Sequence, residues 1–160
     1  MKFKKRVLVV EDMKNWRELL VRILSPEYDV TAVDSFEKAK EAIAVQTDSF
    51  HVAILDIRLK DDDSNNRQGL EIARLLKFMG EYTKTIILTG YPTIETVKEA
   101  ITDCSVYEYL EKVPEDGEKE FDPDEFCQIV RKAASKASQL NLNRNINSLL
   151  SKKRHIPEKE

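Results

Sequence analysis

The sequence predicts an α/β domain, that is, a parallel sheet with helices on both faces. Short apolar runs rich in β-branched residues alternate with longer segments in which apolar residues recur every three or four positions. Five runs and five segments follow one another in this way, and crossover connections between such runs make the strands parallel and place helices on both faces. Several runs end beside an acid, a hydroxyl or a lysine, as expected where the carboxyl ends of parallel strands form a site.

The first half of the chain supplies three of the expected strands. Residues 51–55 form an apolar run typical of a buried central strand, and Asp56 follows it directly. In the segment 15–24, apolar residues recur with the spacing of a helix packed on a sheet. The expected elements, in order, are a strand at 6–10, a helix at 15–24, a strand at 28–33, a helix from Ser35 to about Gln46, and a strand at 51–55.

The second half resumes this alternation after a polar loop at 58–69, which has no periodicity and is expected to be exposed. Thr93 and the pair Asp122-Pro123 indicate helix starts, since each supplies a capping side chain. Gly80 indicates a helix end. The expected elements are a helix at 70–79, a strand at 85–88, a helix from 94, a strand at 106–110, and a helix from 123.

The C-terminal segment differs from the rest of the chain. Four asparagines between 141 and 147 predict a break or bend in the last helix, because asparagine is a poor helix former. We therefore divide the chain into a domain at 1–138 and a helical, basic extension at 139–160. The extension carries a second apolar stripe, made of Leu142, Ile146, Leu149 and Leu150. We expect this stripe to pack on a second copy of the chain, which would give a homodimer, or back on the domain.

Composition and charge disfavour several classes of protein. With 41% hydrophobic residues the chain is expected to fold, and 160 residues suffice for one domain with an appendage. The net charge of −3 and the lack of a helix-turn-helix pattern disfavour nucleic acid as a partner, although residues 131–160 are basic. No apolar stretch approaches the length of a membrane span or signal peptide, and Cys104 and Cys127 fit no ligand pattern. We expect a cytoplasmic protein with reduced cysteines and no membrane partner.

Acids, a hydroxyl and a lysine are predicted to meet at one edge of the sheet. Glu11 and Asp12 follow the first strand, and Asp56 follows the third. Thr89 and Lys112 stand at the ends of the fourth and fifth strands. A carboxylate can attack a phosphoryl group when a hard divalent cation and an ammonium neutralise the charges of both. The set therefore predicts an aspartyl-phosphate site centred on Asp56.

At these positions the sequence resembles the receiver domain of two-component response regulators, over about residues 4–138. The matching segments, in order and at roughly the family's spacing, are VLVVED, AILDIRL, IILTG and YEYLEKV. The resemblance implies a flavodoxin-like, doubly wound five-stranded sheet of order 2-1-3-4-5. It also implies a phosphoacceptor rather than an enzyme with an external substrate, and a histidine kinase or phosphotransfer protein as the partner that phosphorylates Asp56.

The resemblance further implies a set of ligands and a switch. Mg²⁺ would be bound by Glu11, Asp12, Asp56 and the backbone carbonyl of Arg58, and the phosphoryl group by Thr89 and Lys112. Tyr109, three residues before Lys112, would be the aromatic residue that turns inward when Thr89 moves to the phosphoryl group.

The sequence departs from the family pattern around this site. Lys60 stands where the family usually has a proline, and the loop that follows is longer. Val113 follows Lys112 where the family usually has a cis-bonded proline. Arg58 and Tyr91, at places that control the access of water in the family, are both bulky. We therefore predict a long-lived acyl phosphate.

Two other functions remain open on the sequence. A phosphatase of the haloacid dehalogenase type would have a second acid two residues after the nucleophile, where Arg58 stands. A pseudo-receiver that is never phosphorylated, and that binds partners through its tail and long loop, would tolerate Val113 and the loop insertion. The run Asp61-Asp62-Asp63 resembles a further metal cluster, but charge runs in loops are usually only solvated.

Overall fold

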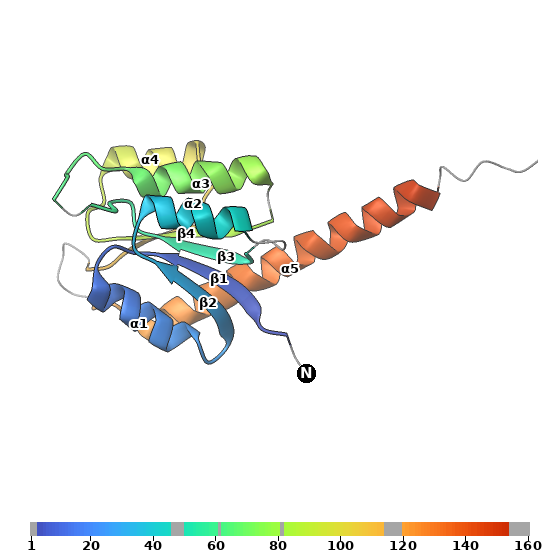
Figure 1. The fold of residues 1–160 in the computed structure, drawn as a ribbon, viewed down its shortest axis with the longest axis horizontal. Coiled ribbons are helices and arrows are strands. Elements are labelled where there is room, and N and C mark those ends of the chain that lie inside the picture. Colours follow the sequence, from blue (N-terminus) through green and yellow to red (C-terminus); the bar gives the residue numbers. More distant parts are fainter. Residues whose placement is uncertain (1–2, 46–49, 61, 81, 114–119, 154–160) are drawn as a thin grey trace, which may run out of the picture.

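A five-stranded parallel sheet of order β2-β1-β3-β4-β5 forms the centre of the molecule (Figure 1). The structure is a computed structural model and describes residues 3–45, 50–60, 62–80, 82–113 and 120–153. The elements are β1 (Lys5–Val10), α1 (Lys14–Leu24), β2 (Tyr28–Val33), α2 (Phe36–Val45), β3 (Val52–Leu55), α3 (Gln68–Met79), β4 (Lys84–Thr89), α4 (Ile94–Thr102), β5 (Glu108–Glu111) and α5 (Pro123–Lys153). The predicted fold class and strand order are confirmed.

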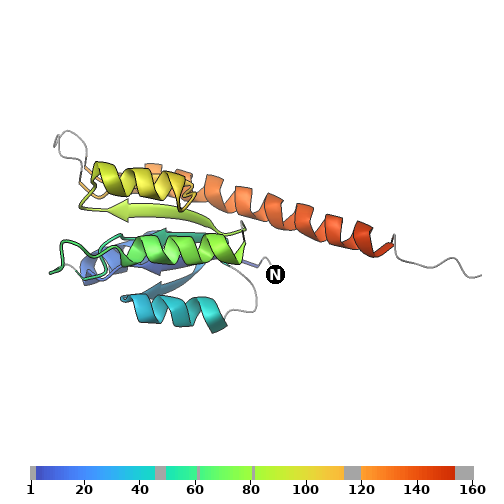
Figure 2. The same ribbon diagram turned by 90° about the horizontal axis from the view of Figure 1, so that it is seen from above.

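Helices cover both faces of the sheet. Helices α2, α3 and α4 lie on one face, and α1 and α5 lie on the other (Figures 1 and 2). Successive strand residues point to opposite faces, so Leu55 and Ile87 pack under the first group while Ile54 and Leu88 pack under the second. All four are buried, and each such burial stabilises the fold by about 1.5–3 kcal/mol.

The register of the strands brings their carboxyl ends to one edge. Val10 of β1 is opposite Leu55 of β3, and Leu55 is opposite Ile87 of β4. Thr89, the last residue of β4, is opposite Glu111 of β5. Side chains that follow these ends therefore emerge together.

Most element bounds agree with the sequence to within two residues. The caps are confirmed: Ser35 Oγ accepts a hydrogen bond from the amide of Lys38 (3.2 Å), and Thr93 forms a capping box with Thr96. The strand predicted at 106–110 begins at Glu108 instead. The amide of Val106 donates to a carbonyl at the end of α4 (3.2 Å), so it is not available to the sheet. Gln46, the predicted end of α2, lies outside the described residues.

The predicted break in the last helix is wrong, since α5 runs without interruption from Pro123 to Lys153. Asparagine costs at most about 0.7 kcal/mol per helical residue relative to alanine and, unlike proline, keeps its backbone amide. Figure 2 shows α5 projecting beyond the sheet. The stripe at 142–150 is exposed, so the expectation that it packs back on the domain is also wrong. Among the described helices, none combines the length and apolarity that crossing a bilayer requires.

Candidate functional site

The carboxyl edge of the sheet brings the five predicted residues together. The strand pairing continues past the strand ends, since the amide of Asp56 donates to the carbonyl of Val10 (3.0 Å). The amide of Lys112 likewise donates to the carbonyl of Thr89 (2.9 Å). These bonds fix Asp56 beside the acids that follow β1 and fix Lys112 beside the end of β4.

The side chain of Lys112 points into this edge and pairs with two acids. Its Nζ lies 2.6 Å from Glu11 Oε2 and 2.8 Å from Asp56 Oδ2. Lys112 is 4% exposed and Glu11 is 1% exposed, so the ion pairs are shielded from water. None of the described peptide bonds is cis, so Lys112 reaches this position with Val113 after it and a trans bond between them.

Burial and neighbouring charges shift the pKa values of Glu11 and Lys112. Burial raises the pKa of Glu11 to about 7, and the Asp56 carboxylate adds to the rise while Lys112 opposes it. Burial alone would lower the pKa of Lys112, but the carboxylates of Asp56 and Glu11 raise it above its usual value. Lys112 therefore stays charged at neutral pH, whereas Glu11 gains or loses its proton near pH 7.

Three acids lie together at this edge, and two of them have a carboxylate oxygen with no hydrogen-bond partner among the described residues. One carboxylate oxygen each from Glu11, Asp12 and Asp56 lies within 4.8 Å of the other two. Oδ1 of Asp12 and Oδ1 of Asp56 are buried and have no hydrogen-bond partner among the described residues. A buried acceptor without a partner is unfavourable, and a hard cation with oxygen ligands would satisfy both. The acidic triad Glu11, Asp12 and Asp56 thus fits Mg²⁺.

Glu11 takes part differently from the other two acids. Its Oε1 accepts the amide of Met13 (3.0 Å), and its Oε2 is bound to Lys112. Both oxygens are therefore already engaged, so Glu11 fits an outer position in which it contacts a cation through water. Asp12 and Asp56 offer their free oxygens directly.

Near the end of β4 the site is bordered by the Thr89 hydroxyl and by Arg58 stacked on Tyr91. Thr89 is fully buried, and its Oγ1 accepts the amide of Tyr91 at 3.3 Å. The guanidinium of Arg58, from the loop after β3, lies 4.0 Å from the centre of the Tyr91 ring. This cation–π contact closes the gap between the loops that follow β3 and β4.

Tyr109 lies half-buried on β5, next to α4. Its Oη is 3.2 Å from Oγ1 of Thr96, in the first turn of α4. Burial raises the pKa of Tyr109, although the hydrogen bond to Thr96 opposes the rise. The predicted switch residue is therefore tied to the helix beside the site.

Sequence reasoning missed a glycine that the site requires. A Cβ atom on Gly69 would lie 1.8 Å from the carbonyl oxygen of Asp56, so only glycine fits there. Its amide also donates to the carbonyl of Ile57 (3.0 Å). The signal was a glycine where the polar loop meets a helix, but nothing in the sequence identified the backbone it would contact.

Two residues of α1 that the prediction did not single out also contact the site. The guanidinium of Arg17 donates to the carbonyls of Glu11 (2.9 Å) and Asp12 (3.1 Å), which fixes the loop between β1 and α1. Nζ of Lys112 lies 5.2 Å from the centre of the Trp16 ring. The helical spacing of α1 predicted Trp16 only as an inward-facing residue.

The acidic loop after β3 does not form a further metal site among the described residues. Asp62 and Asp63 are exposed, and Oδ1 of Asp63 accepts the amide of Asn65 (3.0 Å), which closes a turn. Asp61 lies outside the described residues. Asn66 organises the rest of the loop by accepting the amides of Leu59 and Gln68, each at 3.1 Å.

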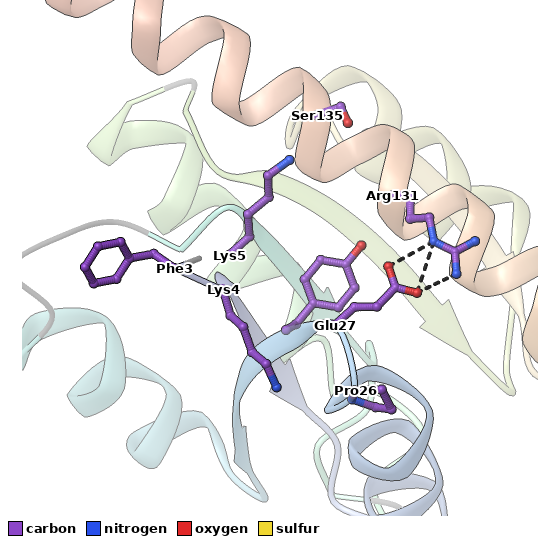
Figure 3. Close-up of a pocket in the computed structure, with 8 residues that line it drawn as sticks. Phe3, Lys4, Lys5, Pro26, Glu27, Arg131 and Ser135 are labelled. Atoms are coloured by element: carbon purple, nitrogen blue, oxygen red, sulfur yellow. Dashed lines mark hydrogen bonds and ion pairs between the residues drawn. The ribbon is translucent and has the colours of Figure 1, made fainter. Parts of the chain in front are cut away.

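A cleft lies at the opposite edge of the sheet (Figure 3). It measures about 540 Å³ and is bordered by the starts of β1 and β2 and by α5. Within it, Nε of Arg131 donates to both carboxylate oxygens of Glu27 (3.0 and 3.2 Å), which ties α5 to the turn before β2. This cleft holds none of the predicted site residues, so the acidic triad remains the candidate site.

Comparison with known proteins agrees with this geometry. The family model "Response regulator receiver domain" matches residues 7–131. A comparison with curated protein sequences gives no match.

Solved structures share the fold. A signal receiver domain of an HD domain-containing protein from Pseudomonas fluorescens Pf-5 has 21% identity and a TM-score of 0.71, covering 85% of this chain and 98% of its own. A response regulator receiver domain protein from Methanospirillum hungatei JF-1 has 20% identity and a TM-score of 0.70, with the same coverage of 85% and 98%. NtrX from Brucella abortus has 24% identity and a TM-score of 0.68, and the match covers 92% of this chain but 29% of NtrX. Because the family model covers most of the sequence and the acidic triad lies at the predicted edge of the sheet, this chain belongs to the response regulator receiver domain family.

Proposed function

We propose that this chain is a signalling receiver that is switched by phosphorylation of Asp56. The phosphoryl donor would be a phosphohistidine of a histidine kinase or phosphotransfer protein. A carboxylate oxygen of Asp56 attacks phosphorus, the O–P bond forms as the P–N bond breaks, and the imidazole leaves with the electron pair of that bond. The observation that carries the proposal is that a buried oxygen of Asp12 and one of Asp56 have no hydrogen-bond partner in the described part of the chain and lie beside a charged Lys112.

The residues around Asp56 have separate tasks in this proposal. Asp12, Asp56 and the backbone carbonyl of Arg58 would hold Mg²⁺, with Glu11 acting through water. The cation, when bound, neutralises charge on the phosphoryl oxygens. Lys112 then balances the negative charge on the opposite side, and Thr89 donates a hydrogen bond to a phosphoryl oxygen. Since Lys112 already bridges two carboxylates, it is held in place before the phosphoryl group arrives.

The output would pass through Thr89 and Tyr109. In the present state Thr89 Oγ1 accepts the amide of Tyr91, and Tyr109 Oη is held by Thr96. A phosphoryl group that engages Thr89 would draw the hydroxyl away from Tyr91 and leave space beside β5. Tyr109 would then turn inward, and the start of α4 would lose its tie to β5.

Trp16 offers a direct test, because it is the only tryptophan of the chain and its ring lies 5.2 Å from Nζ of Lys112. Addition of Mg²⁺ followed by beryllofluoride, which stands in for a phosphoryl group, should change the Trp16 fluorescence. The variant Asp56→Asn should respond to neither addition. Equal responses from the wild type and Asp56→Asn would reject the proposal, and silence from both would favour the pseudo-receiver.

A further inference from the structure

The apolar stripe of the C-terminal extension faces away from the domain. Leu142, Ile146 and Leu149 each lie sixteen residues after a buried residue of the same continuous helix that packs on the sheet. Those buried residues are Phe126, Val130 and Ala133. Sixteen residues turn an α-helix by about 160° beyond four full turns, so the two stripes lie on nearly opposite sides of α5. We call Leu142, Ile146, Leu149 and Leu150 the outer stripe.

The outer stripe is uncovered in the described part of the chain. Its side chains are 60%, 45%, 63% and 55% exposed, in sequence order. Figures 1 and 2 show this part of α5 extending past the end of the sheet, away from the other helices. The spacing i, i+4, i+7 is that of the anchor residues of a helix that lies in an apolar groove. The outer stripe therefore has the exposure and the spacing of a helix face that docks in a groove.

The charges around the outer stripe are of one sign. Residues 126–157 contain seven lysines and arginines and no aspartate or glutamate. Lys132 is exposed and lies five helical turns before Leu150, hence on the same side of the helix. Exposed Lys152 follows the stripe. The surface that covers the stripe must therefore supply negative charge at both of its ends.

A second copy of the chain fits these charges poorly. Two outer stripes packed together would bring the same lysines and arginines face to face, with no acid in 126–157 to pair with them.

An anionic membrane also fits less well. Helices that bind at a membrane surface have a polar face rich in lysine and arginine and often insert an aromatic residue. Between 139 and 151 the polar positions are mostly asparagine and serine, with Arg144 the one basic residue, and the segment has no aromatic residue.

We propose that the outer stripe binds a partner protein through an acidic, apolar helical surface: a helix or helix-lined groove with leucine-like side chains along its centre and aspartate or glutamate along its rims. The stripe would fill the apolar centre, and Lys132 and Lys152 would pair with the rims. This surface is separate from the phosphorylation site, so the inference does not depend on Asp56.

Two synthetic heptad peptides test this on the full chain. Both carry leucine and isoleucine along one face, and they differ only in having glutamate or lysine at the flanking positions. Binding is measured by fluorescence anisotropy of the labelled peptide. We expect the glutamate peptide to bind at least about tenfold more tightly than the lysine peptide, and its affinity to fall as salt is raised.

Variants of the extension complete the test. The triple variant Leu142→Asn, Ile146→Asn, Leu149→Asn should weaken binding of the glutamate peptide at least about tenfold. Ser148→Asn with Ser151→Asn, on the other side of the helix, should leave the affinity unchanged. Circular dichroism and the Trp16 response to beryllofluoride should be the same in all three proteins, which shows that each is folded.

Several results would overturn the proposal. These are equal affinity for the two peptides, no binding of either, or no loss in the triple variant. Sedimentation velocity showing a dimer that the triple variant abolishes would assign the stripe to a second copy. Binding to phosphatidylcholine vesicles containing phosphatidylglycerol, with none to the glutamate peptide, would assign it to a membrane.

Discussion

Gly69 contacts Asp56 backbone to backbone. Its Cα hydrogens face the carbonyl of Asp56, and the position that a Cβ would take is 1.8 Å from that oxygen. Any other residue must push Asp56 or the start of α3 away. The position of Asp56 therefore depends on a residue thirteen positions later that has no side chain.

Replacing Gly69 with alanine should damage both stability and the site. We expect Gly69→Ala to lower the free energy of unfolding by about 3 kcal/mol or more, since the clash is with backbone that has little room to move. Urea denaturation measures this. Gly90→Ala is the matched control, because its new Cβ would meet only Lys112 Cδ, at 3.8 Å, and it should cost less than about 1 kcal/mol. Equal losses in the two variants would contradict the account.

Glu11 should make stability fall with rising pH in the absence of metal. Its pKa is 4.5 when unperturbed and about 7 in the folded protein. Between these values the unfolded chain has released the proton and the folded chain still holds it, so the free energy of unfolding falls as pH rises through this window. The loss is on the order of 3 kcal/mol and is complete just above pH 7.

The variant Glu11→Gln isolates this effect. Its free energy of unfolding, measured in urea with a chelator present, should lack that part of the decline. The difference between wild type and variant should therefore change between pH 4.5 and about 7 and be constant outside that window. A difference that is flat across the whole range would refute the assignment.

At the scale of elements, the loops after β3 and β4 are joined by the stack of Arg58 on Tyr91. The stack lies at the carboxyl edge, where water must approach an acyl phosphate on Asp56. We expect the stack to restrict this approach, because the cation–π contact holds two bulky side chains together.

The stack should slow hydrolysis of the acyl phosphate. Arg58→Ala and Tyr91→Ala should each shorten its lifetime several-fold, followed as loss of radiolabelled phosphate after the donor is removed. Lys60→Ala, an exposed residue of the same loop, is the control and should leave the lifetime unchanged. A wild-type lifetime of seconds, or the same lifetime in all variants, would rule out this role.

The elements also indicate what the sequence could and could not predict. The strands could be predicted because apolar, β-branched runs are typical of buried strands. Asp56, Thr89 and Lys112 could then be placed together, because the carboxyl ends of parallel strands lie at one edge of the sheet. The break in α5 was predicted wrongly because propensity costs of a few tenths of a kcal/mol do not end a helix. The contact of Gly69 with Asp56 was missed because it depends on how a polar loop folds back, and polar loops have no periodicity to read.

At the scale of the whole molecule, the two edges of the sheet carry different features. The carboxyl edge holds the buried charges, and the amino edge is where α5 leaves the domain (Figure 1). The buried residues of α5 all lie in its first half, and they are Phe126, Val130, Ala133, Ala134 and Ala137. Residues 141–150 are all exposed. We therefore propose that 1–138 is the folding unit and that 139–160 is an appendage to it.

Removal of the appendage should leave the domain intact. A chain ending at Ser138 should lose less than about 1 kcal/mol of unfolding free energy, because exposed residues contribute little. Urea denaturation and the Trp16 response to beryllofluoride would both check this against the full chain. A loss of several kcal/mol would show that the extension is part of the fold.

The central claim is that Asp56 accepts a phosphoryl group with the help of a divalent cation. The most direct measurement is intact-protein mass spectrometry after incubation with a small acyl-phosphate donor. We predict a gain of one phosphoryl group that requires Mg²⁺, is abolished by a chelator, and is absent in Asp56→Asn. No gain in the wild type, or the same gain in Asp56→Asn, would contradict the account.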